Sequence, residues 1–200
     1  MKSERPVYPR SFSPDGKRLA YAEANPETGN DIWTLPLEGS DSDHPTAGKA
    51  EPFLRTAANE FDPAFSPDGG WMAYTSDESG NLEVYVRPFP GPGSKWRIST
   101  AGGRIPVWSK SGRELAYETL DGRLMMVSYS VSGDTFTPGK PGLWSNLSVG
   151  NSMDLAPDGK RFAVLMAPPA STEQRSGSGV PFLLNFSDYL KQRVPAGGGR

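Results

Sequence analysis

The sequence predicts an all-β protein, a β-propeller segment of about four blades that are four-stranded antiparallel meanders. A ten-residue phrase occurs four times and begins at Phe12, Phe65, Trp108 and Leu155, which are 53, 43 and 47 residues apart. Strand-rich repeats with a period of about 45 residues are typical of propeller blades. The 20 prolines and 23 glycines among 200 residues leave almost no uninterrupted helical pattern.

Each phrase predicts a strand, a tight turn and a second strand. Three copies contain Pro-Asp-Gly, at 14–16, 67–69 and 157–159, and the third copy has Lys-Ser-Gly at 110–112. Proline fixes φ for a type I turn, aspartate accepts bonds from nearby backbone N–H groups, and glycine supplies a positive φ. We therefore expect a three-residue hairpin with a bulge in all four copies.

Further strands complete each blade. β-branched and aromatic segments follow turns rich in glycine and asparagine, which predicts third strands at 31–37, 82–89 and 123–129 and fourth strands at 51–56, 95–100 and 135–138. The predicted blades cover about 6–58, 59–102, 103–148 and 149–186. A short helix is expected at 187–194, with Ser187 as its cap and Pro195 after its end.

The whole chain, 1–200, is expected to be a single partial propeller. The last blade lacks a clear fourth strand, and four blades are few for a closed ring. An open ring leaves unpaired strand edges, and repeat arrays normally carry terminal caps. These considerations predict the C-terminal part of a larger propeller, with further blades upstream.

Composition narrows the classes of partner. The net charge is −2 and the basic residues are scattered, which argues against nucleic-acid binding. The absence of cysteine excludes disulfides and cysteine metal sites. No stretch approaches the ~18 apolar residues of a membrane span, so we expect no membrane insertion by this chain.

Catalytic, metal and cofactor sites are not expected. His44 is the only histidine, it lies in a Ser-Asp-His-Pro loop, and no Gly-x-Ser-x-Gly elbow is present. The turn aspartates offer one carboxylate per blade, whereas calcium needs six to eight converging oxygens. The segment 91–96 lacks the Gly-Lys-Ser/Thr ending of a phosphate loop and is interpreted as a turn.

The candidate binding residues lie in and just before the first strand of each blade. That strand normally lines the central channel, and the loop before it opens on one face. Two interpretations stay open: a ligand site at the channel mouth, or a wet channel that tolerates polar groups. The candidates are Tyr8, Arg10, Asn59, Glu60, Asp62, Arg104, Asn151 and Asp154.

The phrase Ser-Pro-Asp-Gly followed by Leu-Ala-Tyr or Met-Ala-Tyr resembles the PD40 (WD40-like) repeat of TolB-type propellers, over residues 7–186. Segments 83–103, 106–117 and 184–195 look like the C-terminal propeller of bacterial serine/threonine protein kinases of the PknB-like kind. The resemblance implies a propeller of six or more blades attached to a kinase, without catalytic residues of its own. No His-Arg-Asp or Asp-Phe-Gly motif occurs in this chain, so kinase chemistry would lie upstream.

The expected function is non-catalytic binding of a protein, peptide or small ligand by a sensor or interaction module, the C-terminal part of a larger kinase-like protein. One alternative is the accessory propeller of a prolyl-oligopeptidase-like peptidase, and another is a freestanding TolB-like scaffold. The sequence leaves the compartment open: periplasmic for a receptor-like kinase or TolB-like protein, otherwise cytoplasmic.

Overall fold

The computed structural model describes residues 4–39, 45–110, 113–146 and 153–164, all within the unit Met1–Ala167. These residues contain strands and turns and no helix, so the predicted all-β class is confirmed. The strands are β1 (Val7–Phe12), β2 (Arg18–Asn25), β3 (Gly29–Glu38), β4 (Thr46–Ala47), β5 (Glu51–Leu54), β6 (Glu60–Phe65), β7 (Trp71–Ser76), β8 (Glu83–Pro88), β9 (Trp96–Arg97), β10 (Arg104–Trp108), β11 (Glu114–Glu118), β12 (Leu124–Ser132), β13 (Thr135–Pro138), β14 (Gly142–Ser145), β15 (Met153–Leu155) and β16 (Phe162–Val164).

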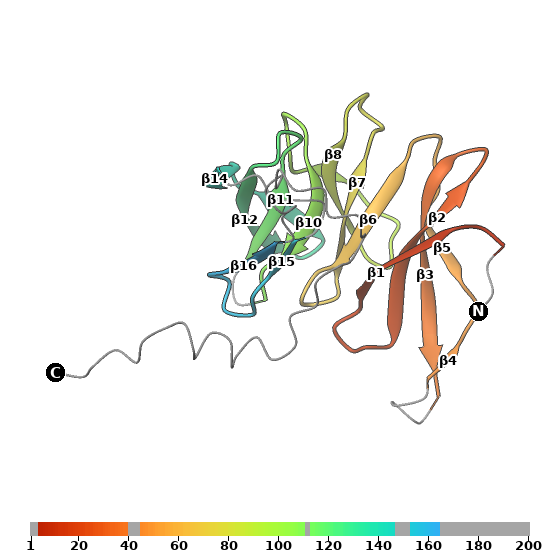
Figure 1. Ribbon diagram of the computed structural model, residues 1–200. Coiled ribbons are helices and arrows are strands. Elements are labelled where there is room, and N and C mark those ends of the chain that lie inside the picture. Colours follow the sequence, from red (N-terminus) through yellow and green to blue (C-terminus); the bar gives the residue numbers. More distant parts are fainter. Residues whose placement is uncertain (1–3, 40–44, 111–112, 147–152, 165–200) are drawn as a thin grey trace, which may run out of the picture. The chain divides into compact units, whose positions relative to one another are not determined.

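The described strands form four antiparallel sheets that follow one another in chain order (Figure 1). The first runs β1-β2-β3-β4 with β5 also paired to β3, the second β6-β7-β8-β9, and the third β10-β11-β12-β13 with β14 also paired to β12. The fourth consists of β15 and β16. We call β1, β6, β10 and β15 the inner strands; β6 contacts β1 and β10, and β10 contacts β15. The contact between the first two sheets is the first junction, and that between the second and third is the second junction.

The predicted hairpin turns are present where the structure describes them. Gly16, Gly69 and Gly159 have φ values of 70°, 73° and 68°, in the left-handed region that glycine adopts without strain. In the first copy Asp15 Oδ1 accepts bonds from Ser13 Oγ at 2.6 Å and from Lys17 N at 3.0 Å, which hold the pKa of the Asp15 carboxyl below its usual value. The turn aspartate therefore stabilises the hairpin, as the sequence pattern predicts.

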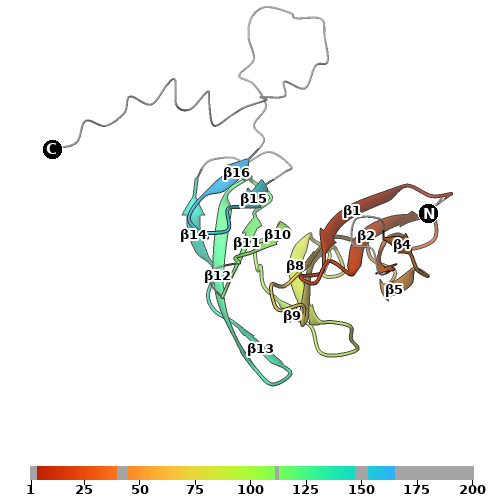
Figure 2. The same cartoon turned by 90° about the horizontal axis from the view of Figure 1, so that it is seen from below.

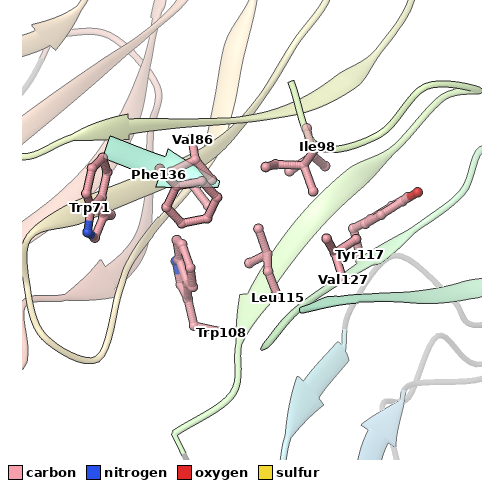
Figure 3. Packing of buried hydrophobic residues seen from close by; sticks show 10 residues of the cluster. Trp71, Val86, Ile98, Trp108, Leu115, Tyr117, Val127 and Phe136 are labelled. Carbon is pink, nitrogen blue, oxygen red and sulfur yellow. The ribbon is translucent and has the colours of Figure 1, made fainter. Parts of the chain in front are cut away.

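A cluster of large aromatic and aliphatic side chains fills the second junction (Figure 3). Trp71 from β7, Trp108 from β10 and Phe136 from β13 lie together, with ring centroids 5.3 Å apart for Trp71–Phe136 and 6.1 Å for Trp108–Phe136. Aromatic pairs at these separations stabilise a core beyond the area that they bury. The aliphatic members include Val86, Ile98, Leu115 and Val127, all buried.

Two outer segments contain short strands that the sequence does not predict. The predicted strand at 135–138 is present as β13 and pairs with the second half of β12 (Figure 2). The strand that pairs with the first half of β12 is β14, at 142–145. The segment 38–49 is rich in Ser, Asp, Gly and Pro, a composition that predicts a loop between strands, yet it contains β4, which pairs with the end of β3. Polar, glycine-rich composition conceals both short strands.

Other expectations fall outside the described residues, including the helix at 187–194, His44 and residues 165–186 of the fourth blade. The predicted limits of the four blades stay predictions. Within the described segments, no helix has the length and apolar character that crossing a membrane requires.

Candidate functional site

A groove runs across the four inner strands. It has a volume of about 960 Å³ and is lined by residues 10–14, 62–67, 105–108, 110 and 153–154. We call it the inner groove. Each inner strand contributes residues just before its phrase, and the first three also contribute the start of the phrase, because the repeat places equivalent positions of successive blades side by side. Volumes of this size suit a small ligand or a short peptide segment.

Irregular backbone gives the groove its form. The pairing register shifts between Pro9 and Ser11 in β1, between Phe61 and Ala64 in β6, and between residues 104 and 107 in β10. Such bulges bend a strand and redirect its side chains. The second and third bulges contain Asp62 and Ile105, each with φ of 53°, and each is followed by a proline.

A positive φ is a strained backbone conformation for these residues, above all for the β-branched Ile105. Contacts with neighbouring groups must therefore stabilise it. Ile105 N donates to Thr75 Oγ1 at 3.2 Å, and the Thr75 hydroxyl makes a long contact of 3.4 Å with Asp62 Oδ2. Asp62 Oδ1 lies 2.7 Å from Arg10 Nη2. These contacts link the first three inner strands from Arg10 to Ile105.

Asp62 and Arg10 set the electrostatics of the groove. The Asp62 side chain is 8% exposed and that of Arg10 is 44% exposed. Burial raises the pKa of Asp62, and the positive charge of Arg10 opposes that rise. The buried Asp62 holds the Arg10 guanidinium in place. Because Arg10 is accessible, its guanidinium can still bind a ligand.

Three of the eight predicted site residues lie along the inner groove: Arg10, Asp62 and Asp154. Asp154 is exposed, and one of its carboxylate oxygens, Oδ1, accepts a bond from Leu155 N at 2.9 Å. Tyr8 is 49% exposed on β1 and does not line the groove. Asn151 lies outside the described residues.

The other three predicted residues connect strands or sheets and do not line the groove. The Arg104 guanidinium binds both carboxylate oxygens of Glu118, at 3.0 and 3.4 Å, and fastens β10 to β11. Asn59 binds Asp77 and accepts a bond from Asn30 N at 3.2 Å. Glu60 is fully buried and accepts a bond from the Thr56 hydroxyl.

Sequence reasoning missed most of the groove, including Phe12, Ile105, Trp108 and Lys110. The signal available was the proline at 63 and at 106, two residues before a phrase, because a proline inside a strand commonly marks a bulge or an edge. Among the described residues, no group of three or more His, Cys, Asp or Glu side chains could hold a metal ion.

No family model matches the sequence. The chain is 32% identical over 120 residues to Tricorn protease homolog 1 of Streptomyces coelicolor, a match that covers 57% of this chain and 10% of that protein.

Among solved structures, TolB from Acinetobacter baumannii superimposes with a TM-score of 0.61 and 22% identity, over 86% of this chain and 40% of TolB. A protein assigned as TolB from Agrobacterium tumefaciens gives a TM-score of 0.59 and 23% identity, over 81% of this chain and 59% of that one. The chain thus spans a tenth of its curated relative and about half of these structures. It has the fold of a TolB-like propeller segment, as the repeat predicts.

Proposed function

We propose that this chain is a non-catalytic binding module that holds an extended peptide segment of a partner protein in the inner groove. The lining combines apolar surface, at Phe12 and the turn prolines, with exposed charges of both signs at Arg10, Lys110 and Asp154. A peptide presents apolar side chains and charges of both signs, so this mixture suits it better than a purely apolar ligand.

The observation that carries the proposal is the Arg10–Asp62 pair, whose carboxylate lies on the strained backbone of β6 beside the strained Ile105 of β10. Backbone strain costs free energy and is concentrated at ligand sites and switches in proteins. Here it positions a buried carboxylate beneath an accessible guanidinium in the groove. Rigid sheets then present a fixed pattern of charge, which favours selective binding.

The test uses a phage-displayed library of random peptides selected on the whole chain, followed by calorimetry with the selected peptides. Lys110→Ala and Arg10→Ala should each weaken binding at least tenfold, because they remove groove charges. Lys110→Ala leaves no buried charge behind, so it separates lost binding from lost folding. The matched control is Arg123→Ala, whose guanidinium pairs with Asp121 at 2.8 Å outside the groove. Equal weakening by all three variants, or by none, contradicts the groove as the site.

The module belongs, in this proposal, to a larger bacterial serine/threonine kinase-like protein and serves as its sensor. Support for the kinase comes only from the sequence resemblance of segments 83–103, 106–117 and 184–195. Binding at a rigid propeller would regulate a separate catalytic domain without any reacting group in the propeller.

A second candidate function is that of an accessory propeller of a peptidase. The observation that favours it is the similarity to a protein named as a tricorn protease homologue. In this role the inner groove would hold a segment of the peptide substrate on its way to a separate catalytic domain.

Sequencing the transcript that encodes the chain distinguishes the two contexts. Upstream His-Arg-Asp and Asp-Phe-Gly motifs would support the kinase, and a downstream serine or other nucleophile motif would support the peptidase. A transcript that encodes only further repeats and a signal peptide would contradict both and favour a scaffold.

A further inference from the structure

Asp62 is a buried carboxylate whose negative charge depends on one ion pair. Its Oδ1 lies 2.7 Å from Arg10 Nη2, yet this oxygen is buried and no described group forms a well-aligned hydrogen bond with it. Its Oδ2 makes a long contact of 3.4 Å with the Thr75 hydroxyl. By contrast, both carboxylate oxygens of the buried Glu118 accept hydrogen bonds from the Arg104 guanidinium.

Two arginines act on the charge of Asp62. Burial raises the pKa of Asp62, and the charge of Arg10 on β1 is the strongest influence that lowers it. Arg104 on β10 acts in the same direction more weakly, and its guanidinium is already paired with Glu118. The other charged residues that line the groove are Lys110 and Asp154. Arg10 is therefore the group that keeps Asp62 charged in the free groove.

The protein can also accommodate Asp62 in its neutral form. Thr75 Oγ1 has two lone pairs and uses one of them to accept the Ile105 N–H at 3.2 Å. The other lone pair can accept an O–H from a protonated Asp62 Oδ2, which lies 3.4 Å away. Protonation therefore gives the new O–H an acceptor and leaves the bond from Ile105 in place.

A carboxylate that binds Arg10 would disturb this balance of charge. Asp62 and Arg10 together carry no net charge, so a bound carboxylate adds one negative charge beside a buried acid. Arg10 then divides its positive charge between two carboxylates, and a like charge at close range disfavours the charged form of the buried one. A proton on Asp62 makes the occupied site neutral again.

We propose that the inner groove binds a carboxylate of its peptide at Arg10 and that Asp62 takes up one proton from solvent in the same step. No bond in the peptide is made or broken. The inference rests on the proposed function of the groove as a peptide site, and it adds an acidic residue to the chemistry of the ligand. By linkage, binding that takes up a proton becomes tighter as the pH falls.

The first experiment needs no ligand. Carboxyl-carbon NMR titration of the whole chain follows Asp62 in the wild type and in Arg10→Gln. Loss of the guanidinium should raise the pKa of Asp62 by at least one pH unit, since a neighbouring arginine lowers an aspartate pKa by about 1–3 units. Asp15, whose hydrogen bonds come from its own turn, is the internal control and should titrate alike in both proteins. An unchanged Asp62 pKa overturns the proposal.

The second experiment uses a peptide returned by the display selection, and a version of it in which amides replace the acidic side chains. Calorimetry in buffers of different ionisation enthalpy counts the protons taken up on binding. The acidic peptide should bind the wild-type chain about tenfold more tightly than the amide version. Its proton uptake should approach about one, and its affinity should rise as the pH falls toward the carboxyl pKa of the peptide, about 4.3 for a glutamate.

Asp62→Asn separates proton uptake from simple charge pairing. Asparagine has nearly the same shape and tolerates the positive φ of this position. No proton is needed when residue 62 is neutral, so the affinity for the acidic peptide should not depend on pH in this range and should exceed that of the wild type about fivefold near neutral pH. Asp154→Asn is the matched control, because it changes an exposed groove carboxylate in the same way and should keep the proton uptake.

The outcomes distinguish this inference from the proposed function. A selection that returns no peptide contradicts the proposed function, and the inference falls with it. A peptide that binds in the groove without an acidic residue, or without proton uptake by the wild-type chain, overturns the inference alone. Weaker binding of the acidic peptide to a folded Asp62→Asn variant at every pH also overturns it, because Asp62 would then be a direct contact of the peptide.

Discussion

The two junctions occupy equivalent places in the repeat, yet different groups fill them. The second junction is aromatic, with Trp71, Trp108 and Phe136 in one cluster. The first junction contains smaller clusters, centred on Ile32 and Tyr74 and on Ala20, Phe65 and Met72. It also buries two carboxylates, Asp31 at 1% exposure and Glu60 at 0%. The repeat therefore determines which positions meet at a junction, but different side chains can occupy those positions.

A hydroxyl group is used differently at the two junctions. Ser99 at the second junction and Thr56 at the first hold the same repeat position. The Ser99 hydroxyl bonds to Glu83 of β8, which also accepts Gly102 N at 3.2 Å. The Thr56 hydroxyl bonds instead to Glu60 of β6.

The position of Glu60 corresponds to Gly103 at the second junction. A Cβ on Gly103 would lie 2.7 Å from Ser99 Cβ and 2.9 Å from Tyr117 Cδ2, so no side chain fits there without movement. At the first junction the carboxylate equivalent to Glu83 is the shorter Asp31, and a glutamate side chain is accommodated. At these two positions the first junction thus has two carboxylates, Asp31 and Glu60, and the second has one, Glu83.

The first junction therefore buries carboxyl groups whose oxygens are not all hydrogen-bonded. Glu60 Oε2 and Asp31 Oδ1 are buried and have no hydrogen-bond partner. Burial raises the pKa of Glu60 from 4.5 to about 7, the Thr56 bond opposes the rise, and the charge of Asp31 adds to it. We therefore expect the stability of the first junction to depend on pH near neutrality through the Glu60 carboxyl.

The largest expected effect is the loss of the aromatic cluster. Trp108→Ala removes a side chain that is 6% exposed and its bond to Ala64 O, so we expect a loss of about 3–5 kcal/mol in the free energy of unfolding. Denaturant titration measures it. Trp108→Phe keeps most of the packing and should cost about 1 kcal/mol. Equal losses for the two variants would show that packing is not what Trp108 contributes.

The next effect concerns the buried acid of the first junction. The raised pKa of Glu60 means that its stabilising contribution is complete below pH 4.5 and is lost as the pH rises through about 7. Glutamine carries no charge at any of these pH values, so Glu60→Gln does not lose this stability. Between pH 4.5 and pH 9 the free energy of unfolding of the variant should therefore rise by on the order of 2–3 kcal/mol relative to that of the wild type. Unfolding curves at a series of pH values measure the difference.

Glu83→Gln is the matched control for this prediction. Glu83 already accepts two hydrogen bonds at the second junction, so its amide variant should lose about 1 kcal/mol at neutral pH and gain nothing. A pH-independent difference between Glu60→Gln and wild type would contradict the assignment of a raised pKa to Glu60.

The smallest effect is expected from added volume at the second junction. Gly103→Ala places a methyl group against Ser99 and Tyr117 and should cost about 1–2 kcal/mol, since overpacking displaces well-packed neighbours. Thermal unfolding followed by circular dichroism measures this loss. Gly142→Ala is the control, because an added Cβ there meets only Met126 O at 3.8 Å; an equal loss in that variant would contradict overpacking as the cause.

The sequence predicts the fold better than the site. The Pro-Asp-Gly turns and alternating strands have local causes, so the turns at Gly16, Gly69 and Gly159 follow from the residues alone. Short strands such as β14 depend on pairing partners far along the chain and carry no local signal. Of the candidate site residues, Arg10, Asp62 and Asp154 lie along the groove. Polar character alone did not separate them from the polar residues that connect strands and sheets.

A crystal structure of the chain with a selected peptide tests the central claim most directly. The account predicts that the peptide lies along β1, β6 and β10 in the inner groove, with one of its carboxylates within hydrogen-bond distance of Arg10 or Lys110. A peptide bound to the outer strands, with the Arg10–Asp62 pair untouched, would contradict it.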